Sequence, residues 1–271
     1  MNLKSKTVII TGGARGIGAA LANRFAAEGA NVVVADLDGH AASAIAAKIG
    51  GLGIACDVTK EADIRALVVA AETHFGPVDM FCSNAGVFYG EPSHSASAGN
   101  DVWASCWDVH VMAHVYAARA VLPGMIERGD GYLLQMASAA GVLNQIGDAA
   151  YSATKHAAVG FAESLAIAHR DEGIKVSVIC PQYVATPMLG YADAQSASDL
   201  PGVITPEDLA ETVVQGIARE SFLILPHPGV AQSMQFKSSD YDKWLKAMRK
   251  LRGRIIDKDG NTDMKAMLKL I

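Results

Sequence analysis

The sequence is poor in cysteine, and none of its four cysteines stands in a CxxC pair. Cysteines spaced this widely are typical of reduced, buried thiols in a cytoplasmic protein, and they argue against a disulfide scaffold. There is also no continuous run of about 18 apolar residues, so we expect no membrane span. The apolar run at residues 8–10 is too short for the core of a signal peptide, which again predicts a cytoplasmic location.

Positive charge is not in excess either. The 23 Lys and Arg residues are outnumbered by 28 Asp and Glu residues, which gives a net charge of −5. This balance argues against nucleic acid as a partner, because a phosphate backbone attracts basic surfaces. With 51% hydrophobic and 19% charged residues in a chain of 271, the composition predicts a globular protein with a sizeable core.

What the sequence does contain is a regular alternation of apolar, β-branched runs with segments of helical period. Strands are predicted at residues 7–11, 31–36, 53–57, 80–83, 132–136, 175–180 and 222–225. Ile64, Leu67, Val68, Ala71 and Phe75 recur at three-and-four spacing, the stripe with which a helix packs on a sheet. The fold class is therefore α/β: a single domain with a Rossmann-type, doubly wound parallel sheet of about seven strands and helices on both faces.

Several segments break this rhythm within the single domain that we expect over residues 1–271. Polar loops at 88–100 and 186–205 follow strands, at the edge where such sheets bind ligands, and we interpret 186–205 as a substrate loop. A helical extension is expected at 238–271. Its apolar residues are Tyr241, Trp244, Leu245, Met248 and Leu251, and its other faces are basic. Packing on its own subunit or a neighbour is favoured over binding to a membrane surface.

A glycine-rich loop, Thr11-Gly12-Gly13-Ala14-Arg15-Gly16-Ile17-Gly18, joins the first strand to a helix. Glycines let a backbone approach a pyrophosphate closely, and the N-terminus of the helix supplies free N–H donors. Asp36 ends the second strand, where a carboxylate accepts the ribose hydroxyls of NAD and repels the 2′-phosphate of NADP. Arg15 points to the opposite preference, because a guanidinium pairs with phosphate. We favour NAD.

Ser138, Tyr151 and Lys155 form the most specific pattern in the chain. Tyr151 and Lys155 are four residues apart, so they share one face of a helix. A nearby ammonium favours a phenolate, so we expect Lys155 to lower the pKa of Tyr151 and make it an acid/base group. Ser138 is placed to hydrogen-bond the same substrate oxygen.

With these residues the sequence resembles the short-chain dehydrogenase/reductase family from about residue 3 to residue 226. The likeness rests on the loop at 11–18, Asp57 after the third strand, Asn84-Ala85-Gly86 after the fourth, the Ser138/Tyr151/Lys155 set, and the segment 181–187 after the sixth. It implies a homodimer or homotetramer that binds a nicotinamide dinucleotide.

The resemblance also implies roles for individual residues. Asp57 and Val58 would hold the adenine, Lys155 would hydrogen-bond the nicotinamide ribose, and Val184 and Thr186 would contact the carboxamide. The full set of expected cofactor contacts is Gly12, Arg15, Gly16, Ile17, Gly18, Asp36, Leu37, Asp57, Val58, Asn84, Ala85, Gly86, Tyr151, Lys155, Val184 and Thr186.

The chain departs from the family pattern at two positions. His110 stands where the family has an asparagine that supports a water chain from the lysine, so it either keeps the proton relay and adds pH sensitivity or is structural. We include His110 among the candidate catalytic residues. His110 and His114 have a spacing that suits a metal, but no third ligand is evident, so no metal site is expected. Gln182 replaces a glycine and would project near the substrate.

The predicted function is hydride transfer between NAD(H) and a secondary alcohol or ketone of modest size. No arginine is placed to hold a carboxylate or phosphate of the substrate. The pocket is expected to use Phe88, Tyr89, Leu143, Asn144, Gln145, Gln182, Tyr183 and residues 188–203. Two alternatives stay open: an NADPH-dependent carbonyl reductase, and a non-catalytic NAD(H)-binding sensor.

Overall fold

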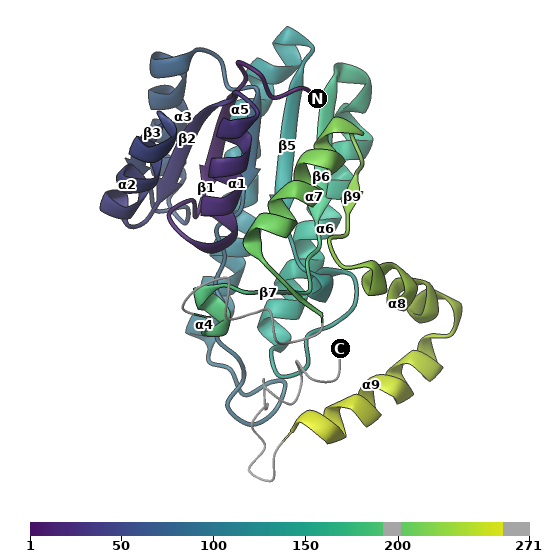
Figure 1. The fold of residues 1–271 in the computed structure, drawn as a ribbon. Coiled ribbons are helices and arrows are strands. Elements are labelled where there is room, and N and C mark those ends of the chain that lie inside the picture. The colour runs from purple at the N-terminus through teal and green to yellow at the C-terminus, as the bar shows by residue number, and fades with distance from the viewer. Residues whose placement is uncertain (192–201, 257–271) are drawn as a thin grey trace.

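The computed structural model describes residues 1–191 and 202–256, and it contains one seven-stranded parallel sheet. The strands lie in the order β3-β2-β1-β4-β5-β6-β9, and this is a doubly wound parallel sheet as predicted from the sequence (Figure 1). They are β1 (Thr7–Thr11), β2 (Asn31–Asp36), β3 (Leu52–Ala55), β4 (Met80–Ser83), β5 (Gly131–Met136), β6 (Ile174–Ile179) and β9 (Leu223–Ile224). All seven predicted strands are present, with ends displaced by at most two residues.

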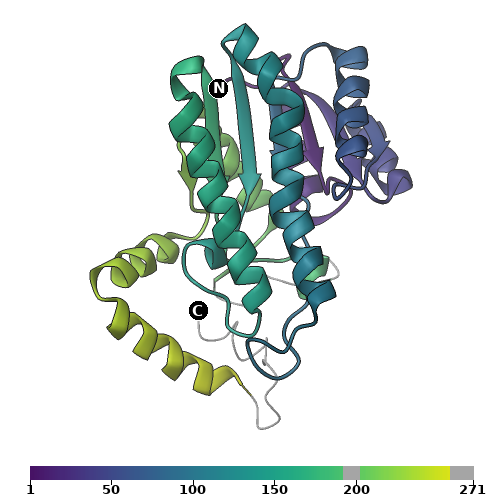
Figure 2. The same cartoon turned by 180° about the vertical axis from the view of Figure 1, so that it is seen from behind.

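Helices cover both faces of the sheet (Figures 1 and 2). One core cluster joins the sheet to α1 (Gly16–Ala27), α2 (Gly39–Ile49) and α7 (Pro206–Ala218). The other joins it to α3 (Glu61–Phe75), α5 (Ala113–Arg128) and α6 (Ala149–His169). In β1, Val8 and Ile10 enter the first cluster and Ile9 the second. Two covered faces are the reason that strands are apolar at consecutive positions.

The helical segment before β5 has an irregular middle. It consists of α4 (Asn100–Trp107), the π-helical turn η1 (Asp108–Met112) and α5. By length and composition, Asn100–Arg128 could cross a membrane, which revises the expectation that no such segment exists. Half of its most apolar window is buried, and α5 packs on α3, β4 and β5, as a core helix of this fold does.

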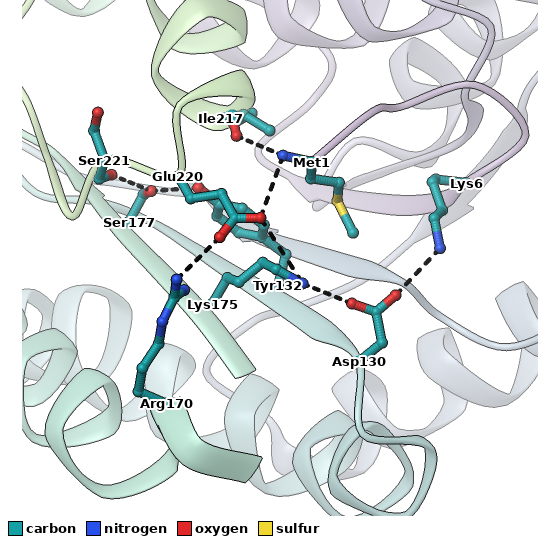
Figure 3. A network of polar contacts seen from close by, with 10 residues as sticks. All are labelled: Met1, Lys6, Asp130, Tyr132, Arg170, Lys175, Ser177, Ile217, Glu220 and Ser221. Atoms are coloured by element: carbon teal, nitrogen blue, oxygen red, sulfur yellow. Dashed lines mark hydrogen bonds and ion pairs between the residues drawn. The ribbon is translucent and has the colours of Figure 1, made fainter. Parts of the chain in front are cut away.

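Ionic contacts join the amino-terminal ends of the strands (Figure 3). Lys6, just before β1, lies 2.9 Å from Asp79 and 3.4 Å from Asp130, and Asp130 also pairs with Lys175 of β6 at 2.8 Å. Glu220 pairs with Arg170 at 3.1 Å. These contacts stabilise the end of the sheet opposite to the one at which ligands are expected.

After β6 the chain forms short elements and then an arm. The short elements are β7 (Tyr183–Val184), which pairs with β8 (Val203–Ile204), and the 3-10 turn η4 (Pro187–Leu189). Two other 3-10 turns precede β6: η2 (Ala139–Gly141) follows β5, and η3 (Arg170–Glu172) follows α6. The arm is α8 (Pro228–Ser239) and α9 (Tyr241–Ile255), which reach away from the sheet (Figure 1). The helical extension thus begins before residue 238, and its expected part at 257–271 lies outside the described residues.

Candidate active site

A cleft of about 740 Å³ opens at the carboxyl ends of the strands. The three residues Ser138, Tyr151 and Lys155 line it together with every expected cofactor contact, whereas His110 does not. Those contacts are Gly12, Arg15, Gly16, Ile17, Gly18, Asp36, Leu37, Asp57, Val58, Asn84, Ala85, Gly86, Val184 and Thr186. The fold thus brings residues from across the chain to one place.

The glycine loop has the geometry of an anion cradle. Gly12 has φ +62, and a Cβ on Gly18 would lie 2.1 Å from the Gly12 oxygen, so these positions accept no side chain. Helix α1 follows with no side-chain cap and no acidic residue in its first turn. Its N–H groups and positive dipole end are therefore available, and the loop could hold a pyrophosphate.

Asn84 fastens this loop to the end of β4. Its side-chain nitrogen donates to the oxygens of Thr11 and Gly12 at 2.9 and 3.1 Å. Its backbone N–H donates to the Thr11 hydroxyl at 3.0 Å. The side-chain amide of Asn84 thus donates two hydrogen bonds to the backbone of the glycine loop. This explains why an asparagine stands where the ends of β1 and β4 meet.

Carboxylates dominate the far end of the cleft. Asp36 accepts hydrogen bonds from the N–H groups of Ala14 and Asp38 at 3.0 and 3.1 Å, which fixes its carboxylate at the cleft. The guanidinium of Arg15 is 64% exposed and lies 3.8 Å from Asp38. Asp57 accepts from the hydroxyl of Thr59 at 2.7 Å, which is the main cause of the lowering of its pKa.

Ser138, Tyr151 and Lys155 meet at the opposite end. Ser138 follows β5, and the other two lie on α6, whose N-cap Asp148 accepts from the Tyr151 N–H at 2.9 Å. The Lys155 ammonium lies 5.6 Å from the centre of the Tyr151 ring and donates to the Met136 oxygen at 3.0 Å. Asp148 also accepts from the Gly90 N–H at 2.8 Å, so it joins the loop after β4 to α6.

The electrostatics of Tyr151 differ from the prediction. Burial raises its pKa to about 12, against a hydrogen bond with Ser138 that lowers it. The expected net lowering of this pKa was therefore wrong, because desolvation of the phenolate outweighs the interactions that favour it. Burial also lowers the pKa of Lys155 to about 8. At neutral pH the phenol carries its proton and the amine is mostly cationic, a pair suited to proton donation.

His110 lies behind Tyr151, with its ring centre 5.3 Å from that of the tyrosine. Its Nε2 accepts from the Val87 N–H at 3.1 Å, so the proton sits on Nδ1, which donates to the Thr154 hydroxyl at 2.9 Å. Burial, with smaller contributions from Lys155 and His114, lowers the His110 pKa to about 2. The ring is therefore neutral at physiological pH, which argues against the alternative in which His110 adds pH sensitivity to the proton relay. A part in a proton relay stays a prediction.

His227 was not identified from the sequence. It is buried where β9 ends, and its Nδ1 accepts from the Gln182 N–H at 3.1 Å. Its Nε2 donates to the Tyr183 oxygen, also at 3.1 Å. The ring thus fixes the loop after β6, and Gln182 lines the cleft as expected. No local pattern predicts this contact, because the partners are more than forty residues apart.

The substrate half of the cleft is mostly apolar. Phe88, Tyr89, Gln145, Gln182, Tyr183, Met188 and Leu189 line it as predicted, together with Val87, Ser105 and Val109, which were missed. Leu143 and Asn144, which were also expected, do not line it. Residues 192–201 of the expected pocket segment lie outside the described part of the chain. Within the described residues, no group of three His, Cys, Asp or Glu side chains could hold a metal.

The comparisons with known proteins agree with this geometry. Residues 6–197 match a family model described as short chain dehydrogenase. The chain is 34% identical to a 1-deoxy-11-beta-hydroxypentalenate dehydrogenase of Streptomyces exfoliatus, over 83% of this chain and 84% of that protein. It is 33% identical to a mitochondrial borneol dehydrogenase of Lavandula x intermedia, over 83% and 88% of the two chains.

Among solved structures, a short chain dehydrogenase/reductase from Burkholderia phymatum in complex with NAD is similar. The TM-score is 0.80 at 27% identity, over 89% of this chain and 96% of that one.

Proposed function

The chain belongs to the short-chain dehydrogenase family of oxidoreductases, and from that premise we propose that it transfers a hydride between NAD(H) and a secondary alcohol or ketone of modest size. The observation that carries the proposal is the meeting of Ser138, Tyr151 and Lys155 in the cleft that the glycine loop also lines. A bound nicotinamide supplies or accepts the hydride.

In the reduction direction Tyr151 donates its phenolic proton to the carbonyl oxygen as that oxygen gains charge. Ser138 donates a hydrogen bond to the same oxygen and orients it. The Lys155 ammonium, one turn along α6, stabilises the phenolate that remains. In the oxidation direction the same phenolate accepts the hydroxyl proton, so the proton balance holds both ways.

Asp36 and Asp38 support NAD over NADP. Both carboxylates line the cleft where the adenosine ribose would lie, and a 2′-phosphate would meet their negative charge. The Arg15 guanidinium, which could favour NADP, already faces Asp38 at 3.8 Å. We therefore expect Asp36→Ala to shift the ratio of turnover with NADP to turnover with NAD upward by about tenfold or more, since removal of one close charge is worth at least about one pKa unit of interaction.

The test is a panel of secondary alcohols and ketones, with oxidation and reduction of the nicotinamide followed by absorbance. We expect turnover with NAD(H), and we expect Ser138→Ala to lower kcat by about 10²-fold or more through loss of one donor. Binding of NADH without turnover of any member would instead favour the NAD(H)-binding sensor. Preference for NADPH in the wild-type protein would favour the carbonyl reductase.

The assembly and the cellular location belong to this proposal as well. We propose a homodimer or homotetramer in the cytoplasm. Light scattering on the purified protein tests the assembly, and a monomer over a wide concentration range would contradict it.

A further inference from the structure

The arm formed by α8 and α9 contacts the segment after η2 through the ammonium group of Lys237. Lys237 of α8 donates from Nζ to the backbone oxygens of Val142 and Leu143, at 3.0 Å each. These carbonyls directly follow η2, the turn that Ser138 caps. The arm is thereby fastened to the segment between the candidate catalytic serine and α6.

The same ammonium also faces two aromatic rings of α9. It lies 4.9 Å from the ring centre of Trp244 and 5.6 Å from that of Tyr241. Cation–π attraction is strongest over tryptophan and increases when the cation is desolvated. Lys237 therefore ties together three segments: the chain after η2, its own helix and α9.

The far end of α9 packs against residues that line the cleft. Ile255 is 1% exposed and clusters with Tyr183, and the partly buried Leu251, Leu189 and Ile146 pack against that pair. Tyr183 and Leu189 both line the cleft. The end of α9 thus supports the substrate side of the cleft from behind.

The sequence of α9 fits this position. Trp244, Met248, Leu251 and Ile255 are spaced by four, three and four residues, so they form one stripe along the helix. These four are buried or half-buried, whereas the lysines and arginines of α9 are exposed. Tyr241 and Leu245, which were expected on the apolar face, are 56% and 43% exposed.

We propose that α9 supports the substrate pocket from behind, through the packing of its far end with Tyr183 and Leu189, and that Lys237 is the positioning residue that holds α9 there. The arm then determines specificity: it favours neutral, apolar alcohols long enough to reach Tyr183 and Leu189. This inference rests on the proposed function, because it names the substrate class of the same cleft.

The test uses a homologous series of secondary alcohols that differ only in chain length. In the wild-type protein kcat/KM should rise about three- to fourfold with each methylene that enters the apolar part of the pocket. In Lys237→Met the longer members should lose about five- to tenfold in kcat/KM through KM, because a partly buried cation–π and hydrogen-bonded contact is lost. The shortest members and kcat should stay unchanged.

Two further variants separate a positioning role from a general loss of structure. Lys237→Arg keeps the cation and should recover much of the KM of the long members. Lys246→Met removes an exposed ammonium from α9 and should behave as the wild-type protein does. Hydrogen exchange of residues 241–255 should be faster in Lys237→Met alone.

Calorimetric binding of the same series to the protein loaded with NAD gives a readout that does not need turnover. If affinity increases with chain length in the wild-type protein but not in Lys237→Met, the role of α9 is supported even if no alcohol is oxidised. In that case only the proposed function would fail. Equal KM and binding profiles in Lys237→Met and the wild-type protein would overturn the inference, whether or not hydrogen exchange in α9 had changed.

Discussion

Buried histidines that are held in one tautomer organise the surroundings of the cleft. His227 accepts a hydrogen bond from the Gln182 N–H and donates one to the Tyr183 oxygen, so each ring nitrogen has a defined role. His110 has the same arrangement toward Val87 and Thr154. Neutral imidazole suits these positions, because it is both a donor and an acceptor on opposite edges of a small ring.

We predict that His227→Phe keeps the ring volume but leaves the Gln182 N–H and the Tyr183 oxygen unpaired. Each buried unpaired group costs about 1–3 kcal/mol, so the free energy of unfolding should fall by about 2 kcal/mol or more. The loop after β6 should also lose its fixed position, which lowers kcat/KM. Urea unfolding and steady-state kinetics measure both effects.

His74→Phe on the exposed surface of α3 is the matched control for this substitution, and it should change neither quantity. A His227→Phe variant as stable and as active as the wild-type protein would show that the ring is not needed to hold the loop.

The candidate acid/base residues could be predicted from the sequence because their chemistry is local. Tyr151 and Lys155 share one helix, and a spacing of four places them on one face without knowledge of the fold. The pKa of Tyr151 could not be predicted, because it depends on burial by segments far away in the chain. His227 was missed for the same reason.

At the scale of elements, the turn η1 decides which of two neighbouring side chains reaches the cleft. Val109 lines the cleft, whereas His110 lies in the core against α6. A π turn inserts an extra residue and changes the helical phase. A pattern of regular helical period cannot predict this change, so Val109 was absent from the expected pocket.

The seven strands could be predicted because two covered faces demand continuous apolar runs. The pair β7–β8 could not, because two-residue strands have no period. The arm was only partly predicted. Helix α9 has a clear amphipathic pattern, whereas α8 has a mixed sequence and packs mainly on α9.

Helix α7 depends on its first residues. Thr205 accepts a hydrogen bond from the Asp208 N–H at 3.0 Å, and the Asp208 carboxylate accepts from the Thr205 N–H, which makes a capping box. We predict that Thr205→Ala lowers the free energy of unfolding by about 1 kcal/mol. The matched variant Thr212→Ala, a half-buried position in the middle of the same helix, should change it by less than about 0.5 kcal/mol. Equal effects in urea unfolding would contradict a capping role.

At the scale of the whole molecule, the two ends of the sheet serve different purposes. The carboxyl ends of the strands carry the cleft, and the amino ends carry the ion pairs around Asp130 and Glu220 (Figure 3). Such partly exposed pairs contribute little each, so most of the stability comes from the two apolar clusters.

Buried histidines should make the folded protein sensitive to mild acid. Burial lowers the pKa of His110 to about 2 and that of His114 to about 3, whereas an unfolded histidine titrates near 6.5. Below about pH 6.5 the unfolded state therefore binds protons that the folded state does not, and stability falls as the pH falls. The loss approaches about 1.4 kcal/mol per pH unit for each such group.

Urea unfolding between about pH 6.5 and pH 5 measures this slope, since the carboxylates titrate mainly below that window. His110→Asn should lower the slope of unfolding free energy against pH by up to about 1.4 kcal/mol per pH unit, the contribution of one proton. An identical slope in the variant and the wild-type protein would contradict this prediction. It would mean that His110 takes up its proton over the same pH range in the folded and unfolded states.

The most direct test of the central claim is a single turnover of a ketone by Tyr151→Phe loaded with NADH. We expect that NADH still binds and that hydride transfer slows by about 10²–10⁴-fold, because the proton donor is gone while the rest of the cleft is intact. Hydride transfer at the wild-type rate would contradict the account.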